Sequence, residues 1–266
     1  MRIELPQAFT IAHERAVADY LADRIGGRAA WAMAFAAFDL LDNAILVTDT
    51  GQVAFRALYR EVVDLPLADA YIYDLLTLND VRHESPPLWA RYARRVVQEV
   101  TQRGWRSPNI LETRLLLAYL LYWWGAFARG YALEAEVFRD LARSSLMFVA
   151  HDLRDRQQRF SPSDLTILGM AGDIKTSVYF VQAATPLAHD FYIVRLTVQE
   201  QAHTLVALLQ PGAWKQINGD TISGDLAALP RHFSVPIAIT HRGHRLILLD
   251  YNEWKRRVLR RQGGIE

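Results

Sequence analysis

The chain has no cysteine among its 266 residues. This absence excludes a disulfide framework, thiolate zinc sites, iron–sulfur clusters and a cysteine nucleophile. The fold must therefore be stabilised by packing, for which a hydrophobic content of 51% is sufficient. A cysteine-free chain also fits a reducing compartment, and we expect the protein to be cytoplasmic.

Lysine is scarce as well. The only lysines are Lys175, Lys215 and Lys255, so 27 of the 30 basic residues are arginine. The net charge of +1 gives no overall attraction to nucleic acid, and any nucleic-acid-binding surface must be local. In a chain that uses arginine so consistently, a lysine indicates a position that needs a compact ammonium group.

Long apolar runs are also missing. The most apolar segment, residues 115–127, is too short to span a bilayer and lies between Arg114 and Arg129, so we expect a buried helix and no membrane partner. Glu4 and Glu14 interrupt the region in which a signal peptide would be apolar, and we expect mature sequence there. The sequence has no Walker-type loop, dinucleotide fingerprint or G-x-S-x-G elbow, which disfavours nucleotide-driven motors, common dehydrogenases and α/β-hydrolases.

Apolar spacing in the first half is typical of helices. Apolar residues recur at three- and four-residue intervals over residues 29–41 and 52–63, which predicts two helices with one buried face each. Residues 43–49 are instead typical of a short strand.

Proline and glycine mark the ends of the next expected helices. One helix is predicted to start at Pro86-Pro87 and to end at Gly104. The next is predicted to start at residues 107–109, and Gly130 is expected to separate it from a further helix.

Beyond these helices the sequence becomes rich in β-forming residues. Short candidate strands, separated by Gly, Pro, Asn and Asp, cover residues 146–153, 164–169, 173–181, 190–198 and 204–210. A hairpin around Gly243 and a basic helix over residues 252–261 follow. Helices followed by strands predict an α+β protein, with a helical region at residues 1–105 and the strands in a second region at residues 106–266.

Two acids and a lysine form the most informative pattern. In a strand, Asp173 and Lys175 would project from one face while Ile174 enters the core. Asp164, shortly after Pro162, would reach the same face across a short turn. Carboxylate oxygens are the ligands that Mg²⁺ or Mn²⁺ prefers, and a fixed ammonium group can orient an attacking water. Asp164, Asp173 and Lys175 therefore predict phosphodiester hydrolysis.

These residues resemble the PD-(D/E)XK nuclease superfamily, through the segments 161–164 (SPSD) and 173–177 (DIKTS). In that family a preceding helix often contributes another acid, and here Glu134 is the better match and Glu136 the reserve. The resemblance implies a restriction-endonuclease-like core, which is a mixed β-sheet flanked by helices, within residues 106–266. The order helix, three strands, helix, strand can be followed over residues 130–209. It implies a DNA substrate, a Mg²⁺ or Mn²⁺ cofactor held by Asp164, Asp173 and Glu134, and catalysis by these residues with Lys175.

Other charged residues support weaker predictions. Basic side chains gather in residues 91–106 and again on the C-terminal helix, where the candidate nucleic-acid ligands are Arg256, Arg257, Arg260 and Arg261. A solvated helix face is the alternative for both groups. The eight histidines form no metal-binding motif and are expected in turns or at the surface.

The sequence thus predicts a metal-dependent nuclease whose helical N-terminal region recognises substrate or a protein partner, with a homodimer left open. Two alternatives remain at this point. One is a non-catalytic interaction or accessory protein built on a degenerate nuclease fold. The other is a helical ligand-binding sensor that uses the aromatic residues 122–124.

Overall fold

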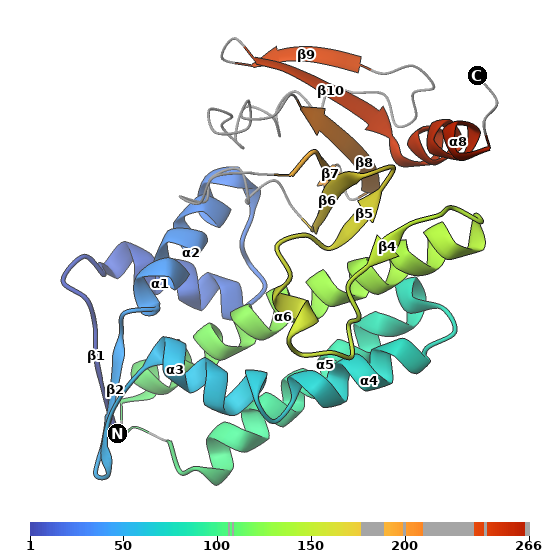
Figure 1. Cartoon of the computed structure of the whole chain (residues 1–266). Helices are drawn as coiled ribbons and strands as arrows, with labels where there is room; N and C mark the ends of the chain where they lie inside the picture. Colours follow the sequence, from blue (N-terminus) through green and yellow to red (C-terminus); the bar gives the residue numbers. More distant parts are fainter. Residues whose placement is uncertain are drawn as a thin grey trace. The chain divides into compact units, whose positions relative to one another are not determined.

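The computed structural model describes residues 1–105, 107, 109–176, 189–198, 201–209, 237–241 and 244–263 (Figure 1). They form two compact units, Met1–Ala128 and Arg129–Glu266. The boundary falls inside one helix, α6 (Ile110–Arg143), further along the chain than the predicted boundary at residue 105. Packing explains the difference, because Tyr119 and Trp124 of α6 are buried in the first unit. The α+β class is confirmed.

The first unit is mainly helical and carries one small sheet. Its elements are β1 (Arg2–Glu4), α1 (Ile11–Leu21), α2 (Gly27–Leu41), β2 (Ile45–Thr48), β3 (Gly51–Ala54), α3 (Phe55–Tyr59), the π-helical turn η1 (Arg60–Asp64), α4 (Ala68–Thr77), α5 (Val81–Gln102) and the first part of α6. The strands form an antiparallel sheet in the order β1-β2-β3. The helix predicted over residues 29–41 and the strand predicted within residues 43–49 are both confirmed.

The helix predicted from residue 52 starts later than expected. Gln52 and Val53 belong to β3, where they pair with Val47 and Leu46 of β2, and α3 begins only at Phe55. Only the first three residues of the predicted helix are strand, which is too few to disturb the three- and four-residue apolar spacing over residues 52–63. Pairing with a neighbouring strand decides the conformation here, and spacing along the sequence does not report it.

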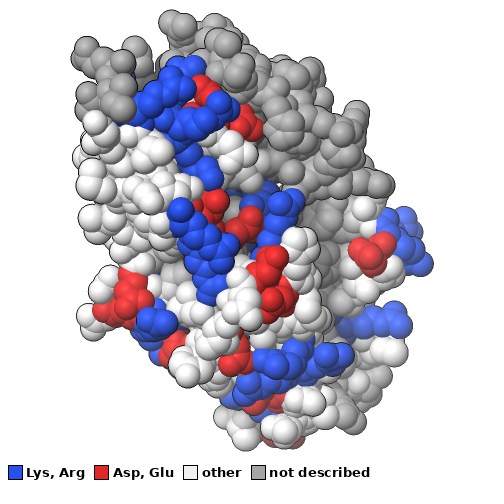
Figure 2. Space-filling model, turned by 90° about the vertical axis from the view of Figure 1, so that its right-hand side faces the viewer, with Lys and Arg blue, Asp and Glu red and all other residues white. Residues whose placement is uncertain are grey.

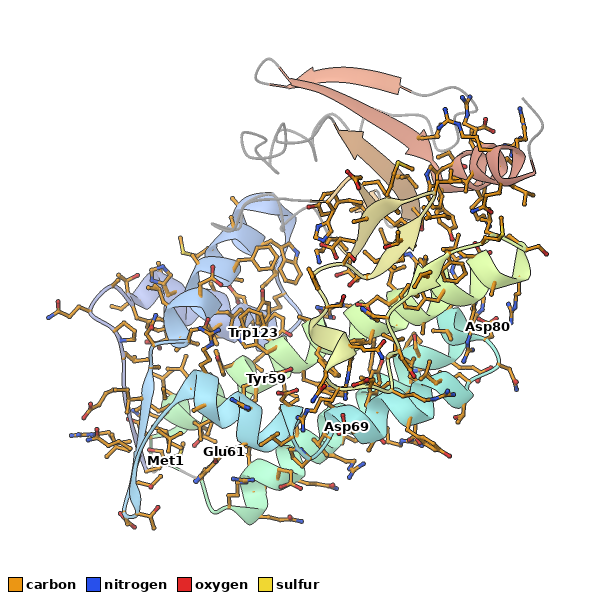
Figure 3. All side chains as sticks on the ribbon, in the orientation of Figure 1. Met1, Tyr59, Glu61, Asp69, Asp80 and Trp123 are labelled. Carbon is orange, nitrogen blue, oxygen red and sulfur yellow. The ribbon has the colours of Figure 1, made fainter. Side chains whose placement is uncertain are left out.

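Helix α5 starts before the two prolines that were predicted to begin it. Asp80, labelled in Figure 3, caps the helix by accepting a hydrogen bond from the His83 backbone N–H, and Glu84 accepts one from the Asp80 N–H. Pro86 and Pro87 therefore lie inside the helix. The cap, together with the burial of Val81 and Leu88, offsets the backbone hydrogen bonds that the prolines cannot donate.

Helix α6 runs without a break through Gly130, so the predicted separation into two helices is wrong. A glycine inside a helix costs only about 0.5–1 kcal/mol relative to alanine. Three residues that follow it on α6 are buried in the core of the second unit, and their burial offsets that cost: Leu133, Val137 and Leu141.

Replacing Gly130 with alanine should stabilise the protein. A Cβ atom at this position would have no heavy atom within 4 Å, and alanine restricts the unfolded chain more than glycine does. We expect the free energy of unfolding to rise by about 0.5–1 kcal/mol, as measured by urea denaturation. A lower stability would show that α6 needs a glycine at this position.

The second unit contains a seven-stranded sheet in the order β4-β5-β6-β7-β8-β10-β9. Its elements are the last part of α6, β4 (Val149–Ala150), the 3₁₀ turn η2 (Gln158–Phe160), β5 (Leu165–Ile167), β6 (Met170–Lys175), β7 (Phe191–Val198), β8 (Gln201–Leu209), β9 (Ile237–His241), β10 (His244–Asp250) and α8 (Tyr251–Gln262). Strands β6 and β7 are parallel, and the other neighbouring pairs are antiparallel. The predicted mixed sheet is confirmed.

Several expected elements of this unit agree with the structure. The strands predicted over residues 190–198 and 204–210, the final hairpin and the basic helix are β7, β8, β9–β10 and α8. The strand predicted over residues 146–153 shortens to Val149–Ala150, and the one predicted over residues 173–181 begins earlier, at Met170. Its continuation beyond Thr176 and the predicted turn residue Gly243 lie outside the described residues.

The core of the second unit lies between α6, α8 and the sheet. Leu133, Val137 and Leu141 of α6 share one buried cluster with Ile174 of β6 and Trp254 of α8. Figure 1 shows β5 and β6 as the hairpin next to the later part of α6. This packing fixes the strands that carry the predicted acids against the helix that carries Glu134.

The apolar segment 115–127 lies within α6, and its buried residues include Leu115, Leu116 and Leu120, as expected for a buried helix. Among the described residues, no helix is both long enough and apolar enough to cross a membrane.

Candidate metal centre

Strand β6 presents Asp173 and Lys175 on one face. The Lys175 ammonium group donates a hydrogen bond to Oδ1 of Asp173 over 2.6 Å. Ile174 between them is buried in the core, as alternation along a strand requires. The Asp173 side chain is 11% exposed and the Lys175 side chain 36%, so the lysine is the more accessible of the two.

Asp164 lies directly across the hairpin from this strand. Its backbone N–H donates to the Gly172 carbonyl over 3.0 Å, and its Oδ2 accepts from the Ile174 N–H over 2.7 Å. The turn between β5 and β6 is tight, with Leu168 and Gly169 at φ of 52° and 76°. The short sequence interval between Asp164 and Asp173 is therefore the length of a hairpin that places the two acids together.

Helix α6 and the segment after β4 add two more side chains. Nε2 of His151 lies 3.1 Å from Oε2 of Glu134, and Nδ1 of His151 lies 3.8 Å from Oδ1 of Asp164. One ligand atom from each of Glu134, His151 and Asp164 can be chosen so that all three lie within 4.8 Å of one another. The predicted residues Glu134, Asp164, Asp173 and Lys175 thus belong to one constellation.

His151 was missed by sequence reasoning. Its side chain is only 4% exposed, so the expectation that the histidines lie in turns or at the surface is wrong for this residue. The backbone explains its place, because the His151 N–H donates to the Asp164 carbonyl where β4 pairs with β5. No short motif could reveal it, since the ligands meet through pairing of strands.

His189, just before β7, was also missed. Its Nε2 donates to the carbonyl oxygen of Pro162, which is only two residues before Asp164. Its Nδ1 lies 3.0 Å from the Tyr192 hydroxyl and 3.7 Å from Oδ2 of Asp173. Tyr192 is the register partner of Asp173 on β7. His189 therefore links the segment that carries Asp164 to the strands around Asp173.

The acids alter the protonation of the site. Burial, then the negative charge of Glu134, and then the hydrogen bond with Asp173 and its charge together raise the pKa of Asp164 to about 9, while the Ile174 N–H acts in the opposite direction. At neutral pH without a bound cation, Asp164 therefore holds a proton that it shares by hydrogen bond with Asp173. A divalent cation can replace this proton.

Glu136, the reserve candidate on α6, has a different partner. Its two carboxylate oxygens each accept a hydrogen bond from the Arg195 guanidinium over 2.7 Å. This bidentate pair holds Glu136 against β7, whereas Glu134 contacts His151. The structure brings Glu134 to the other predicted site residues.

Two of the four arginines on α8 that were predicted to bind nucleic acid form ion pairs within the helix. Arg256 and Arg257 pair with Glu253 at 2.9 Å and 2.8 Å, whereas Arg260 and Arg261 are exposed near the end of the helix. On the face shown in Figure 2, basic and acidic side chains lie interspersed. The nucleic-acid-binding role of these four arginines stays a prediction.

Gly172 is required by the packing next to Asp173. A Cβ atom here would overlap the ring of Phe191, its fully buried register partner on β7. We expect Gly172→Ala to lower the free energy of unfolding by about 1–3 kcal/mol, because the ring or the strand must move. Urea denaturation of Gly172→Ala beside Gly130→Ala measures this, since the same added methyl group should have opposite effects. An unchanged free energy of unfolding in Gly172→Ala would contradict the close contact between Gly172 of β6 and Phe191 of β7.

Comparison of the chain with protein-family models, with curated proteins and with solved structures found no match. Carboxylate oxygens from Glu134 and Asp164 and a nitrogen from His151 lie close enough together to surround one cation, and Asp173 is hydrogen-bonded to Asp164. This donor set fits a divalent metal ion.

Proposed function

We propose that the protein is a metal-dependent nuclease that hydrolyses phosphodiester bonds, with DNA as the expected substrate. The observation that carries the proposal is the β5–β6 hairpin, which joins Asp164 to Asp173 while Lys175 donates to Asp173. Two acids and an ammonium group on one face are the set that this hydrolysis needs.

Each side chain has a role in this proposal. Asp164 and Asp173 hold a divalent ion, and Glu134 adds negative charge beside them. When bound, Mg²⁺ or Mn²⁺ neutralises phosphate charge and makes a bound water more acidic. Lys175 is the most exposed of these groups and is fixed by Asp173, so its ammonium group can orient the attacking water and stabilise negative charge on the phosphate.

The order of elements also supports the proposal. The resemblance implies a helix, three strands, a helix and a strand, and the described elements from α6 through β4, β5 and β6 to β7 follow this order where they are described. Strand β7 is parallel to β6 and lies beside the Asp173 strand. The connection between β6 and β7 lies outside the described residues.

A non-catalytic accessory protein is less well supported. A degenerate nuclease fold would separate its acids, whereas Asp164 and Asp173 share a hydrogen bond. The ligand-binding sensor is also less well supported, because the Tyr122 ring stacks on Phe38 with centroids 4.0 Å apart and Trp124 donates to the Trp89 carbonyl. Tyr122 and Trp124 therefore serve packing within the first unit.

The proposal is tested by a cleavage screen of the full chain. Single-stranded, duplex and branched DNA and matching RNA are incubated with Mg²⁺ or Mn²⁺, and with EDTA as the metal-free control. We expect cleavage that requires the metal and that is lost in the Lys175→Ala variant. Cleavage that persists in EDTA, cleavage at the wild-type rate in Lys175→Ala, or no cleavage of any substrate would contradict the proposal.

A further inference from the structure

We propose that His151 is a nitrogen ligand of the metal and that Glu134 acts by orienting its imidazole ring, so that the site selects Mn²⁺ over Mg²⁺. This inference deepens the proposed function and rests on it. It assigns to Glu134 a positioning role in place of direct contact with the ion.

The first observation is a buried nitrogen atom. Nδ1 of His151 is shielded from solvent and has no hydrogen-bond partner among the described residues. Buried polar atoms in proteins are almost always paired, and an exception requires an explanation such as an ion. The atom that faces Nδ1 is Oδ1 of Asp164, 3.8 Å away. This separation is too long for a hydrogen bond but is within the range of about 3–4 Å between two ligands of one small cation.

The second observation is the partner of the other ring nitrogen. Nε2 of His151 lies 3.1 Å from Oε2 of Glu134, and an ionised carboxylate can only accept a hydrogen bond. The proton of a neutral ring is then on Nε2, which leaves the lone pair on Nδ1 facing Asp164. A carboxylate that holds a histidine by its distal nitrogen is a recurring way to orient a metal ligand.

The surroundings hold the ring in this orientation. Phe138, one helical turn after Glu134 on α6, meets the His151 ring edge to face, with centroids 5.7 Å apart and planes at 86°. The His151 N–H donates to the Asp164 carbonyl, and the Asp164 N–H donates to the Gly172 carbonyl, next to Asp173. The three proposed ligands are therefore tied together by the backbone before any metal binds.

A nitrogen ligand changes which ion the site prefers. Mg²⁺ strongly favours oxygen ligands and gives up its water reluctantly. Mn²⁺ also binds carboxylates, but as the first member of the transition-metal affinity series it accepts an imidazole nitrogen more readily than Mg²⁺ does. A site with Nδ1 of His151 beside two carboxylates should therefore bind Mn²⁺ more tightly than Mg²⁺. A purely carboxylate site would show a smaller difference.

The test uses the full chain and titrates Mn²⁺ or Mg²⁺ by calorimetry, with His151→Gln, Glu134→Gln and the matched control Glu136→Gln. We expect the wild type to bind Mn²⁺ at least roughly tenfold more tightly than Mg²⁺, and His151→Gln to lose most of that preference. Glu134→Gln keeps an oxygen that can accept from Nε2 and should retain the preference. Glu136→Gln, which alters a carboxylate held by Arg195, should bind both ions like the wild type.

A spectroscopic readout decides the assignment independently of activity and of variant folding. Electron spin echo measurements on Mn²⁺ bound to the wild type should show coupling to an imidazole nitrogen, and folded His151→Gln should lack it. Mn²⁺ binding without that coupling, or an unchanged Mn²⁺ preference in His151→Gln, would overturn the inference and leave metal-dependent cleavage standing. If Glu134→Gln abolishes Mn²⁺ binding, the positioning role of Glu134 is wrong. Absence of any Mn²⁺ or Mg²⁺ binding would contradict both this inference and the proposed function.

Discussion

Asp164→Asn should make the metal-free protein more stable at pH 8 and at the same time remove its binding of Mn²⁺. The wild-type carboxyl is mostly buried, and its pKa is raised to about 9 by burial and then by Glu134 and Asp173. An asparagine has no charge to bury. Its oxygen can still accept from the Ile174 N–H, and its NH₂ group can donate to Asp173, so both existing hydrogen bonds keep a partner.

The pH dependence of this effect has a definite sign. Because the folded pKa of Asp164 lies above the unfolded value, its contribution to stability is complete below the unfolded pKa and is lost as pH rises towards about 9. The variant does not titrate at this position. Its advantage over the wild type should therefore grow from pH 5 to pH 8, by up to about 1.4 kcal/mol per pH unit. Urea denaturation in EDTA at both pH values measures it.

Metal binding by the wild type should depend on the same proton. A divalent cation must displace it, so Mn²⁺ affinity should increase with pH up to about 9, the pKa of Asp164, and proton release should accompany binding. Calorimetry in buffers of different ionisation enthalpy detects the released proton. In Asp164→Asn we expect Mn²⁺ affinity to fall at least roughly a hundredfold, because a charged ligand has become neutral.

Asp155→Asn is the control for this experiment. The pKa of Asp155 is lowered, mainly by the hydrogen bond from the Gln157 backbone N–H, so its contribution to stability is already complete at pH 5. The stability difference between this variant and the wild type should be the same at pH 5 and at pH 8. If Asp164→Asn showed the same constant difference, or were less stable than the wild type at pH 8, Asp164 would not carry a raised pKa.

Lys175→Ala should lower the rate of metal-dependent cleavage by about 10²–10⁴-fold while the fold and metal binding persist. The Lys175 side chain is 36% exposed, and a partly exposed ion pair contributes little to stability. Removing its positive charge leaves the carboxylates free to bind a cation. Single-turnover cleavage, circular dichroism and Mn²⁺ calorimetry on the same preparation separate these effects.

Lys175→Arg is the matched variant, because it keeps the positive charge. The guanidinium group is larger and planar, whereas the site holds a compact ammonium 2.6 Å from Asp173. We expect Lys175→Arg to lose most of the cleavage activity as well. Wild-type rates in Lys175→Ala would remove the catalytic role, and wild-type rates in Lys175→Arg would show that charge alone is sufficient.

Sequence patterns predicted those parts of the fold that depend on local chemistry. The helix over residues 29–41, the β9–β10 hairpin and α8 all follow from apolar spacing and turn residues, and all are present. The start of α5 and the continuity of α6 through Gly130 were wrong. For α5, the cap at Asp80 outweighs the proline signal. For α6, packing of the residues after Gly130 in the core outweighs the glycine signal.

The candidate site likewise contains residues that local sequence rules predict and residues that they do not. Asp164, Asp173 and Lys175 could be predicted because strand alternation and a short turn are local rules. Glu134 came from resemblance, and the structure places it next to His151. The two histidines could not be predicted, because His151 reaches the site through pairing of β4 with β5 and His189 precedes the parallel strand β7.

Composition and the two-residue period of a strand need no tertiary information, and they are sufficient for the α+β class, for the rarity of lysine in the chain and for the face shared by Asp173 and Lys175. The contact of Glu134 with His151 and the pairing of Glu136 with Arg195 follow from packing. The two glutamates lie on one helix, and the elements packed against each side of that helix give each its partner. Such contacts depend on three-dimensional packing between elements distant in sequence, which local sequence rules do not encode.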